Sequence, residues 1–311
     1  MIPGGEDAQR WISGFVQPTG PMEVFHERPW ATVVRVPVAH GKSCWFKICA
    51  PIQAFETRLT ADLFARWPDR VSEVLGHDEA RSWLLLGDAG TRLGDIGNPP
   101  EVWLGVLPLY GELQRGEAVH ASEHLAHGVP DLRLRLLPDR YEDLLRTDLP
   151  LEPVEIQRLR DVAPRFQTLC DELEGFGIPE TIQHDDLHMG NVYVDGGSSR
   201  VLDWGDACVS HPFFSLVETF RFLEELNGFS PDDRWFSRLA DAYLEGWERE
   251  ATTAFPLALE VGAFAHAIAW IRQRDALPAE ARPEFDRAFS VVLRRALKGR
   301  RLEAHDVRGR S

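Results

Sequence analysis

Residues 184–191 read HDDLHMGN, and residues 203–205 read DWG. In this series the carboxylate of Asp186 precedes the amide of Asn191 by five residues, and a second carboxylate follows at Asp203. Phosphoryl transfer from a nucleoside triphosphate needs such groups: a carboxylate to orient an attacking hydroxyl, and oxygen ligands to hold a metal ion against the phosphates. The series therefore predicts an enzyme that uses ATP and Mg²⁺, with Asp186 as the catalytic base and Asn191 and Asp203 as metal ligands.

The segment between the two halves of the series has the pattern of a β-hairpin. Residues 192–194 and 201–202 are mostly β-branched or aliphatic, and the residues between them, 195–199, read DGGSS. An aspartate followed by glycines between two such runs is a strong hairpin signal. We expect the hairpin to return Asp203 to the neighbourhood of Asn191. Polar residues are common in loops, but loop polarity alone does not explain this order and spacing.

The series resembles the catalytic segment of the aminoglycoside phosphotransferase family, with His188 where protein kinases usually carry a lysine. The resemblance covers most of the chain, residues 25–300, although only the catalytic segment is specific. It implies a two-lobed protein-kinase-like α+β fold, ATP in the cleft between the lobes, and a small-molecule hydroxyl as acceptor. His184 would then support the loop by hydrogen bonding. The acceptor stays open, because the superfamily also contains choline, fructosamine, homoserine and sugar kinases.

The first part of the chain predicts a small β-rich lobe. Residues 31–38 and 44–49 are strand-like and flank a short polar turn, which favours antiparallel pairing. A helix is expected after Pro51, where apolar residues recur at four-residue intervals, and residues 71–75 and 83–86 resemble further strands. We therefore expect residues 1–88 to form a nucleotide-binding lobe with one main helix.

The remainder, residues 89–311, predicts a helical lobe that carries the catalytic loop, the metal site and the acceptor pocket. Apolar residues recur at helical spacing, and helices are expected at 101–127, 156–173, 213–226, 233–249, 256–274 and 285–297. The tail from Arg300 is charged and lacks this periodicity, so it is expected to be loosely structured.

Lys47 is one of only three lysines in the chain and lies inside a predicted strand, between Phe46 and Ile48. An unpaired ammonium would be costly to bury there, although an edge-strand lysine can extend its amine to solvent. We predict that Lys47 binds the α- and β-phosphates. The resemblance implies an acidic partner on the following helix, for which Glu56 is the first candidate and Asp62 the competitor.

Several residues near the catalytic series keep alternative roles. Asp185 is a rival base if the register is wrong. His188 could lie near the γ-phosphate or pack the loop, and Asp206 could cap a turn, orient the metal site or contact substrate. Residues 25–32, where the family would place a glycine-rich phosphate loop, contain no glycine. Arg28 could assist there, but the choice between ATP and GTP stays open.

Composition restricts the partners. The formal net charge of −15 argues against nucleic acid, whose phosphates would be repelled. No apolar run approaches the length of a membrane span, and residues 1–20 lack the features of a secretion signal. The four cysteines show no metal or disulfide spacing. We therefore expect a cytoplasmic protein that acts on a small molecule, with its oligomeric state open.

The acceptor pocket is expected in the helical lobe, where acidic residues are frequent: Glu218, Glu224, Glu225, Asp232, Asp233 and Glu245. An acidic pocket would suit amino sugars, aminoglycosides or amino alcohols, but such residues are more often solvated helix faces. His266 and Trp270 lie four residues apart and could line a sugar site, although core packing is the commoner role for such a pair.

The sequence also leaves three other functions to consider. A catalytically silent nucleotide-binding or regulatory module would agree with the missing glycine loop, but it has no need of Asp186, Asn191 and Asp203 together. A metal hydrolase could use His184, Asp186 and His188 as ligands. A protein kinase would need an activation segment, whereas the chain after Asp203 soon enters a helix.

Overall fold

The computed structural model describes residues 2–299, which divide into two compact units. Of the described residues, unit 1 comprises 2–97, 126–129 and 189–206, and unit 2 comprises 98–125, 130–188 and 207–299. The division differs from the cut after residue 88 that the sequence suggested, because two later segments pack with the N-terminal strands. The tail from residue 300, expected to be loosely structured, lies outside the described residues.

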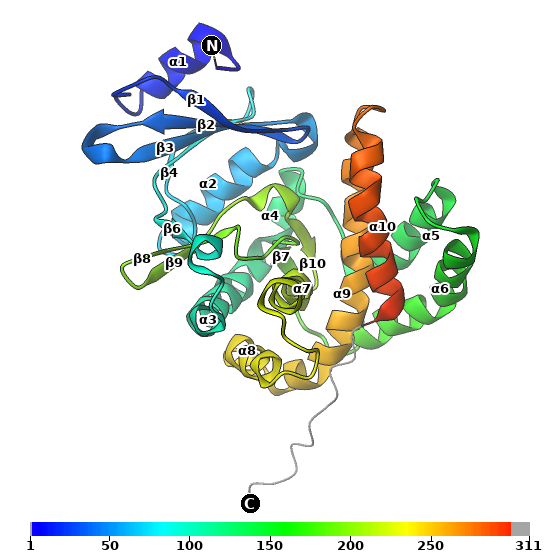
Figure 1. Cartoon of the computed structure of the whole chain (residues 1–311). Coiled ribbons are helices and arrows are strands. Elements are labelled where there is room, and N and C mark those ends of the chain that lie inside the picture. The colour runs from blue at the N-terminus through cyan, green and yellow to red at the C-terminus, as the bar shows by residue number, and fades with distance from the viewer. Residues whose placement is uncertain (1, 300–311) are drawn as a thin grey trace, which may run out of the picture. The chain divides into compact units, whose positions relative to one another are not determined.

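Unit 1 is built on an antiparallel five-stranded sheet in the order β1-β2-β3-β5-β4 (Figure 1). Its strands are β1 (Glu23–Arg28), β2 (Ala31–Pro37), β3 (Ser43–Cys49), β4 (Val74–Asp78) and β5 (Trp83–Leu86). The predicted pairing of the second and third strands is confirmed, with Val33 opposite Lys47. The strand expected at 71–75 begins later, at Val74, because Val71 instead forms a parallel bridge with Val201.

Two helices cover opposite faces of this sheet (Figure 1). Helix α1 (Gly5–Ser13) was not expected; it buries Ala8 and Ile12 against Val34 and Phe46. Helix α2 (Glu56–Arg66) is the expected helix after Pro51. Because side chains alternate along a strand, Phe46 points to the α1 core and its neighbour Lys47 points to the α2 face. Apolar packing against α1 thus fixes the direction of Lys47.

The predicted hairpin is also confirmed. Strands β8 (Val192–Asp195) and β9 (Ser198–Val201) pair in antiparallel register, and β6 (Thr91–Arg92) adds to the β8 edge. The two-residue turn is Gly196-Gly197, with φ of 54° and 93°. Turns with positive φ at both central positions match the twist of a hairpin, and glycine adopts that conformation readily.

Unit 2 is mainly helical. Its helices are α3 (Pro100–Glu117), α4 (Ala121–Ala126), α5 (Leu137–Arg146), α6 (Pro153–Glu174), α7 (Leu216–Asn227), α8 (Arg234–Leu244), α9 (Arg249–Ala276) and α10 (Arg282–Lys298). Strands β7 (Thr181–Gln183) and β10 (Cys208–Ser210) form a small antiparallel pair. Most expected helices are present with shifted ends, but the one expected at 101–127 is divided into α3 and α4 by a short 3₁₀ segment at Ala118–His120. Helix α5 was not expected.

Helix α9 corrects one expectation. Among the described residues it is the one helix that is long and apolar enough to cross a membrane, although no such run was expected from the sequence. In the fold, 61% of its most apolar window is buried, and it packs against α5, α6, α7 and α10. A core helix that is apolar on nearly all sides has the same composition as a membrane span.

Candidate active site

Lys47 is the centre of a buried ion cluster in unit 1. Its Nζ lies 2.8 Å from Oε1 of Glu56 and 2.6 Å from Oδ1 of Asp203. Lys47 and Glu56 are 6% and 1% exposed. Asp62, the competing partner, instead accepts two hydrogen bonds from Arg58, both 2.9 Å long. The expected pair of Lys47 with Glu56 is therefore present, and Asp203 is added to it.

The two carboxylates set the charge of this cluster. Burial alone would lower the pKa of Lys47, but the charges of Asp203 and Glu56 outweigh burial and hold that pKa well above its ordinary value. Burial raises the pKa of Glu56, and the nearby ammonium only partly reverses this. The pKa of Cys49 is raised well above its ordinary value by burial and by the charge of Glu56, so the thiol stays protonated. Lys47 is thus a fixed cation.

The hairpin aligns the two expected metal ligands. The backbone N–H of Leu202 donates to the carbonyl of Asn191 at 2.9 Å, so Asp203 follows directly beside Asn191. Asp203 has a φ of 64°, and its side chain is 53% exposed despite its contact with Lys47. A carboxylate and an amide oxygen are ligands that Mg²⁺ accepts, with water and phosphate oxygens completing its shell. The donor set present in unit 1 therefore suits Mg²⁺.

Gln53 anchors the segment after Asp203 and was missed in the sequence. Its Nε2 donates to Oδ1 of Asp206 at 3.0 Å. A Cβ on Gly205 would lie 2.6 Å from the Gln53 amide carbon, so the glycine of the DWG motif allows this close approach. Asp206 therefore has a structural partner in Gln53, and the three roles left open for it stay predictions.

The catalytic loop lies in unit 2, after β7. The side chain of Asp186 is 33% exposed, and its Oδ2 lies 3.3 Å from Nε2 of His188. The His188 ring stacks on Phe222, with centroids 4.3 Å apart. His188 thus contacts the Asp186 carboxylate and packs against α7. The packing role expected for it is present, and a position near the γ-phosphate stays a prediction.

Hydrogen bonds from three segments hold the backbone of this loop. The N–H of His184 donates to the hydroxyl of Tyr110 at 3.0 Å and to that of Ser215 at 3.3 Å. Thr219 donates to the carbonyl of Leu187 at 2.6 Å. His184 is fully buried, which agrees with the structural role expected for it. Tyr110, Ser215 and Thr219 are far away in the sequence, and no local pattern marked them.

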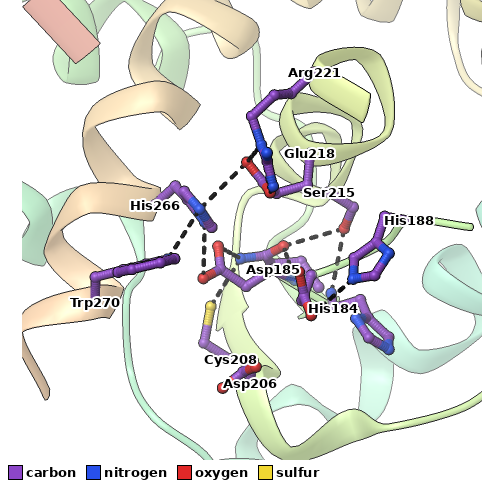
Figure 2. A network of polar contacts seen from close by, with 12 residues as sticks. His184, Asp185, His188, Asp206, Cys208, Ser215, Glu218, Arg221, His266 and Trp270 are labelled. Atoms are coloured by element: carbon purple, nitrogen blue, oxygen red, sulfur yellow. Dashed lines mark hydrogen bonds and ion pairs between the residues drawn. The ribbon is translucent and has the colours of Figure 1, made fainter. Parts of the chain in front are cut away.

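Asp185 is bound to a buried histidine (Figure 2). Nδ1 of His266 lies 3.2 Å from Oδ2 of Asp185, and Nε2 lies 3.3 Å from Oε1 of Glu218. Burial lowers the pKa of His266, but the charges of Glu218 and Asp185 outweigh burial and raise the pKa to about 9. Nε1 of Trp270 also lies 3.0 Å from Nε2. Nε2 cannot both accept from this indole and donate to Glu218, and the two buried carboxylates favour the protonated ring.

A cavity of about 330 Å³ lies beside this network in unit 2. Its lining residues are Val217, Glu218, Arg221, Glu224, Pro231, Leu259, Ala263, His266, Val292, Arg295, Lys298 and Gly299. The acidic side chains expected in this region are paired with arginines. Arg221 donates to both carboxylate oxygens of Glu218 at 2.9 and 2.8 Å. Arg295 pairs with Glu225. The cavity therefore carries charges of both signs.

Residues 98–252, which include the catalytic loop, Asn191 and Asp203, match the model of a phosphotransferase enzyme family. Residues 98–252 therefore belong to this phosphotransferase enzyme family. The expected resemblance is therefore confirmed, and the chain is a small-molecule kinase with a hydroxyl acceptor.

Solved structures show the same fold as this phosphotransferase. A choline/ethanolamine kinase family protein from Mesorhizobium loti is 16% identical, over 95% of this chain and 90% of that chain, with a TM-score of 0.58. A choline kinase from Streptococcus pneumoniae is 10% identical, over 94% and 99%, with a TM-score of 0.62.

A GDP complex of aminoglycoside 2′-phosphotransferase-IIIa is 14% identical to this chain, over 94% of this chain and 99% of that chain, with a TM-score of 0.59. The expected kinase-like α+β fold is confirmed by these likenesses. Among curated proteins, none matches the phosphotransferase described here.

Proposed function

We propose that this phosphotransferase moves the γ-phosphate of ATP to a hydroxyl of a small molecule, with Mg²⁺ as the metal. The observation that carries the proposal is the cluster of Lys47, Glu56 and Asp203, continued by the hairpin to Asn191. A buried lysine held between two carboxylates is a compact cation suited to the α- and β-phosphates. Glu56 would keep Lys47 extended, and Asn191 with Asp203 would hold the metal, which neutralises developing phosphate charge when bound.

Asp186 would act as the base. Its carboxylate, oriented by His188, would accept a hydrogen bond from the acceptor hydroxyl and take its proton as the oxygen attacks the γ-phosphorus. The bond from the γ-phosphorus to the bridging oxygen breaks, ADP leaves, and the phosphate ester forms. Most of the acceleration would come from positioning and from the charges around the phosphates.

The acceptor belongs to the range that the neighbours' names span, which includes choline, ethanolamine and aminoglycosides. GDP complexes among these neighbours keep GTP as the alternative donor. A cytoplasmic location is part of the proposal, and the four cysteines, which are all free and buried, are consistent with it.

The decisive experiment measures Mg²⁺-dependent release of ADP or GDP across a panel of aminoglycosides, amino sugars, neutral sugars, choline, ethanolamine and homoserine. Release that depends on one acceptor class would establish the reaction and its substrate. Asp186→Asn should bind nucleotide normally but turn over about 10²- to 10⁴-fold more slowly, the usual contribution of a general base. Unchanged turnover in that variant would remove Asp186 from the role of base.

Two alternatives give different results in the same assay. A silent nucleotide-binding module would bind ATP but release no product with any acceptor. A metal hydrolase would retain a transition metal after purification. In the part of the chain that the structure describes, His184, Asp186 and His188 do not form a group at metal-ligand spacing, so the geometry gives that hypothesis no support.

A further inference from the structure

The residue just before the proposed base has an unusual backbone conformation. Asp185 has a φ of 60°, in the left-handed region that residues with a side chain rarely adopt. Its N–H donates to Oε1 of Gln183 at 2.7 Å, and Nε2 of Gln183 donates back to Oδ1 of Asp185 at 3.0 Å. The conformation is therefore held by specific contacts, and it sets the direction in which the next residue, Asp186, leaves the loop.

The second carboxylate oxygen of Asp185 faces His266. Asp185 is 5% exposed and His266 is 6% exposed, so neither charge is solvated by water. A buried charge is tolerated only when it is paired and hydrogen-bonded. The contact of 3.2 Å between Nδ1 and Oδ2 supplies the ion-pair partner of Asp185, and Gln183 supplies its hydrogen bond.

Helix α7 completes the arrangement. Glu218 contacts Nε2 of His266 and is itself held by Arg221. One residue further along α7, Thr219 donates to the carbonyl of Leu187. The loop is thus fixed on both sides of Asp186: at Asp185 through His266 of α9 (Figure 2), and at Leu187 through Thr219 of α7.

We propose that His266 is a positioning residue for phosphoryl transfer: the ring, charged between Asp185 and Glu218, fixes the loop backbone at Asp185 and so directs the Asp186 carboxylate. This inference rests on the proposed function, because it assigns no chemistry to His266 itself. His266 contacts neither substrate nor phosphate in the proposed reaction, and it acts through Asp185.

The charged groups around His266 determine how the positioning of Asp186 depends on pH. The loop contributes Asp185, α7 contributes Glu218, Arg221 and Glu224, and α10 contributes Arg295 and Lys298 along the cavity wall. Glu218 and Asp185 raise the pKa of His266 to about 9, against burial and the charge of Arg221. Turnover should therefore fall as the pH rises through about 9, because the neutral ring holds Asp185 less firmly. Glu218→Gln removes the larger favourable charge and should move this fall to lower pH.

The test compares His266→Gln with the full-length wild-type enzyme, using the acceptor found in the panel assay. A glutamine retains a polar donor but carries no charge. We expect kcat to fall roughly 10²-fold, the scale of a small misplacement of a catalytic group. The Kd for nucleotide, measured separately, should not change, and the fall of kcat at high pH should disappear.

His124→Gln is the matched control. His124 is another buried histidine of unit 2, and its Nε2 lies 2.8 Å from Oε2 of the buried Glu117. The same substitution there removes a buried histidine–carboxylate contact without touching Asp185. It should cost stability, as His266→Gln does, while leaving kcat and its pH profile unchanged for the folded enzyme.

Further variants keep the proposal testable if His266→Gln does not fold. Asp185→Asn keeps a residue that tolerates positive φ but removes the charge, and it should lower kcat with the same loss of pH dependence. In the double variant the two effects should not add, since both remove one interaction. Wild-type kcat and an unaltered pH profile in either single variant would overturn the role of His266 but would leave the proposed function standing. A wild-type enzyme without acceptor-dependent release would overturn the proposed function, and this inference with it.

Discussion

At Lys47 the chain places an ammonium where water does not reach it. The strand pattern fixes its face, because Phe46 packs into the α1 core and turns the next side chain to α2. Two carboxylates then compensate for the lost hydration: Glu56, which is buried, and Asp203, which is half exposed. This asymmetry suits a site in which Asp203 must also be available to a metal ion, while the buried Glu56 contacts Lys47 and accepts a hydrogen bond from the Cys49 thiol at 3.5 Å.

Removing this cation should destabilise the fold in a pH-dependent way. Lys47→Met leaves Glu56 buried without its partner, which typically costs about 3–5 kcal/mol. The pKa of Glu56 is already raised, and losing Lys47 raises it further. The folded state then binds a proton at Glu56 more tightly than the unfolded state does. The loss of stability is therefore greatest at high pH, and it becomes smaller as the pH falls towards the pKa that Glu56 has in the unfolded chain.

Urea unfolding of wild type and Lys47→Met at about pH 8 and about pH 5 measures this deficit. Lys42→Met is the control, because Lys42 is exposed in the turn between β2 and β3, and it should stay within about 0.5 kcal/mol of wild type. An equal deficit for Lys47→Met at both pH values would mean that Glu56 is not the group left uncompensated.

The residues that could be predicted differ from those that could not in how far apart their partners lie. Asp186, Asn191 and Asp203 stand close together in the chain, and Lys47 and Glu56 are nine residues apart, so spacing and a known resemblance were enough to propose them as site residues. His266 reaches Asp185 across 81 residues, and Tyr110 reaches His184 across 74. No local periodicity encodes such pairs. The sequence therefore left two roles open for His266, lining a sugar site or packing in the core.

At the scale of elements, alternation and turn chemistry located β2, β3, β5 and the β8–β9 hairpin, but two elements at the N-terminus were missed. Helix α1 is short and mostly polar, and its few apolar residues can be recognised as core residues only from their packing against the sheet. Strand β1 (Glu23–Arg28) is mostly exposed and has no alternating apolar pattern. It occupies residues assigned to a phosphate loop, which leaves only Pro29 and Trp30 for the turn.

The connection between the large sheet and the hairpin depends on Gly90. It has a φ of 94°, and a Cβ there would lie 2.6 Å from the carbonyl oxygen of Val194 and 2.8 Å from Cβ of Asp195. Gly90→Ala should therefore combine backbone strain with a clash against β8. The strain alone costs about 1–2 kcal/mol, and we expect the variant to lose more than this in urea unfolding.

Gly97→Ala separates the two contributions. Gly97 has a similar φ of 87°, but a Cβ there would meet nothing within 4 Å, so only the strain is introduced. The difference in stability between the two variants measures the clash with β8. Equal losses would show that the β6–β8 contact adjusts freely and does not fix the hairpin.

At the scale of the whole molecule, the catalytic series is shared between the two units. The chain passes from unit 2 to unit 1 between His188 and Met189, so Asp186 belongs to the helical unit whereas Asn191 and Asp203 belong to the unit of Lys47. A boundary placed after residue 88 divides the chain by sequence order alone, and it therefore assigns the hairpin to the helical lobe. Backbone pairing decides otherwise: Val201 donates to the carbonyl of Arg70 at 2.8 Å.

This division predicts that the N-terminal residues do not form a stable unit alone. A fragment of residues 1–97 lacks the partner of β6, the bridge from Val71 to Val201, and Asp203 beside the buried Lys47. We expect it to unfold without a cooperative transition in urea, followed by circular dichroism. Appending residues 189–206 through a flexible linker restores all three contacts and should restore a cooperative transition. If residues 1–97 unfolded cooperatively on their own, the hairpin would have to be assigned to unit 2, and the metal ligands would owe their alignment with Lys47 to nucleotide binding instead of to the fold.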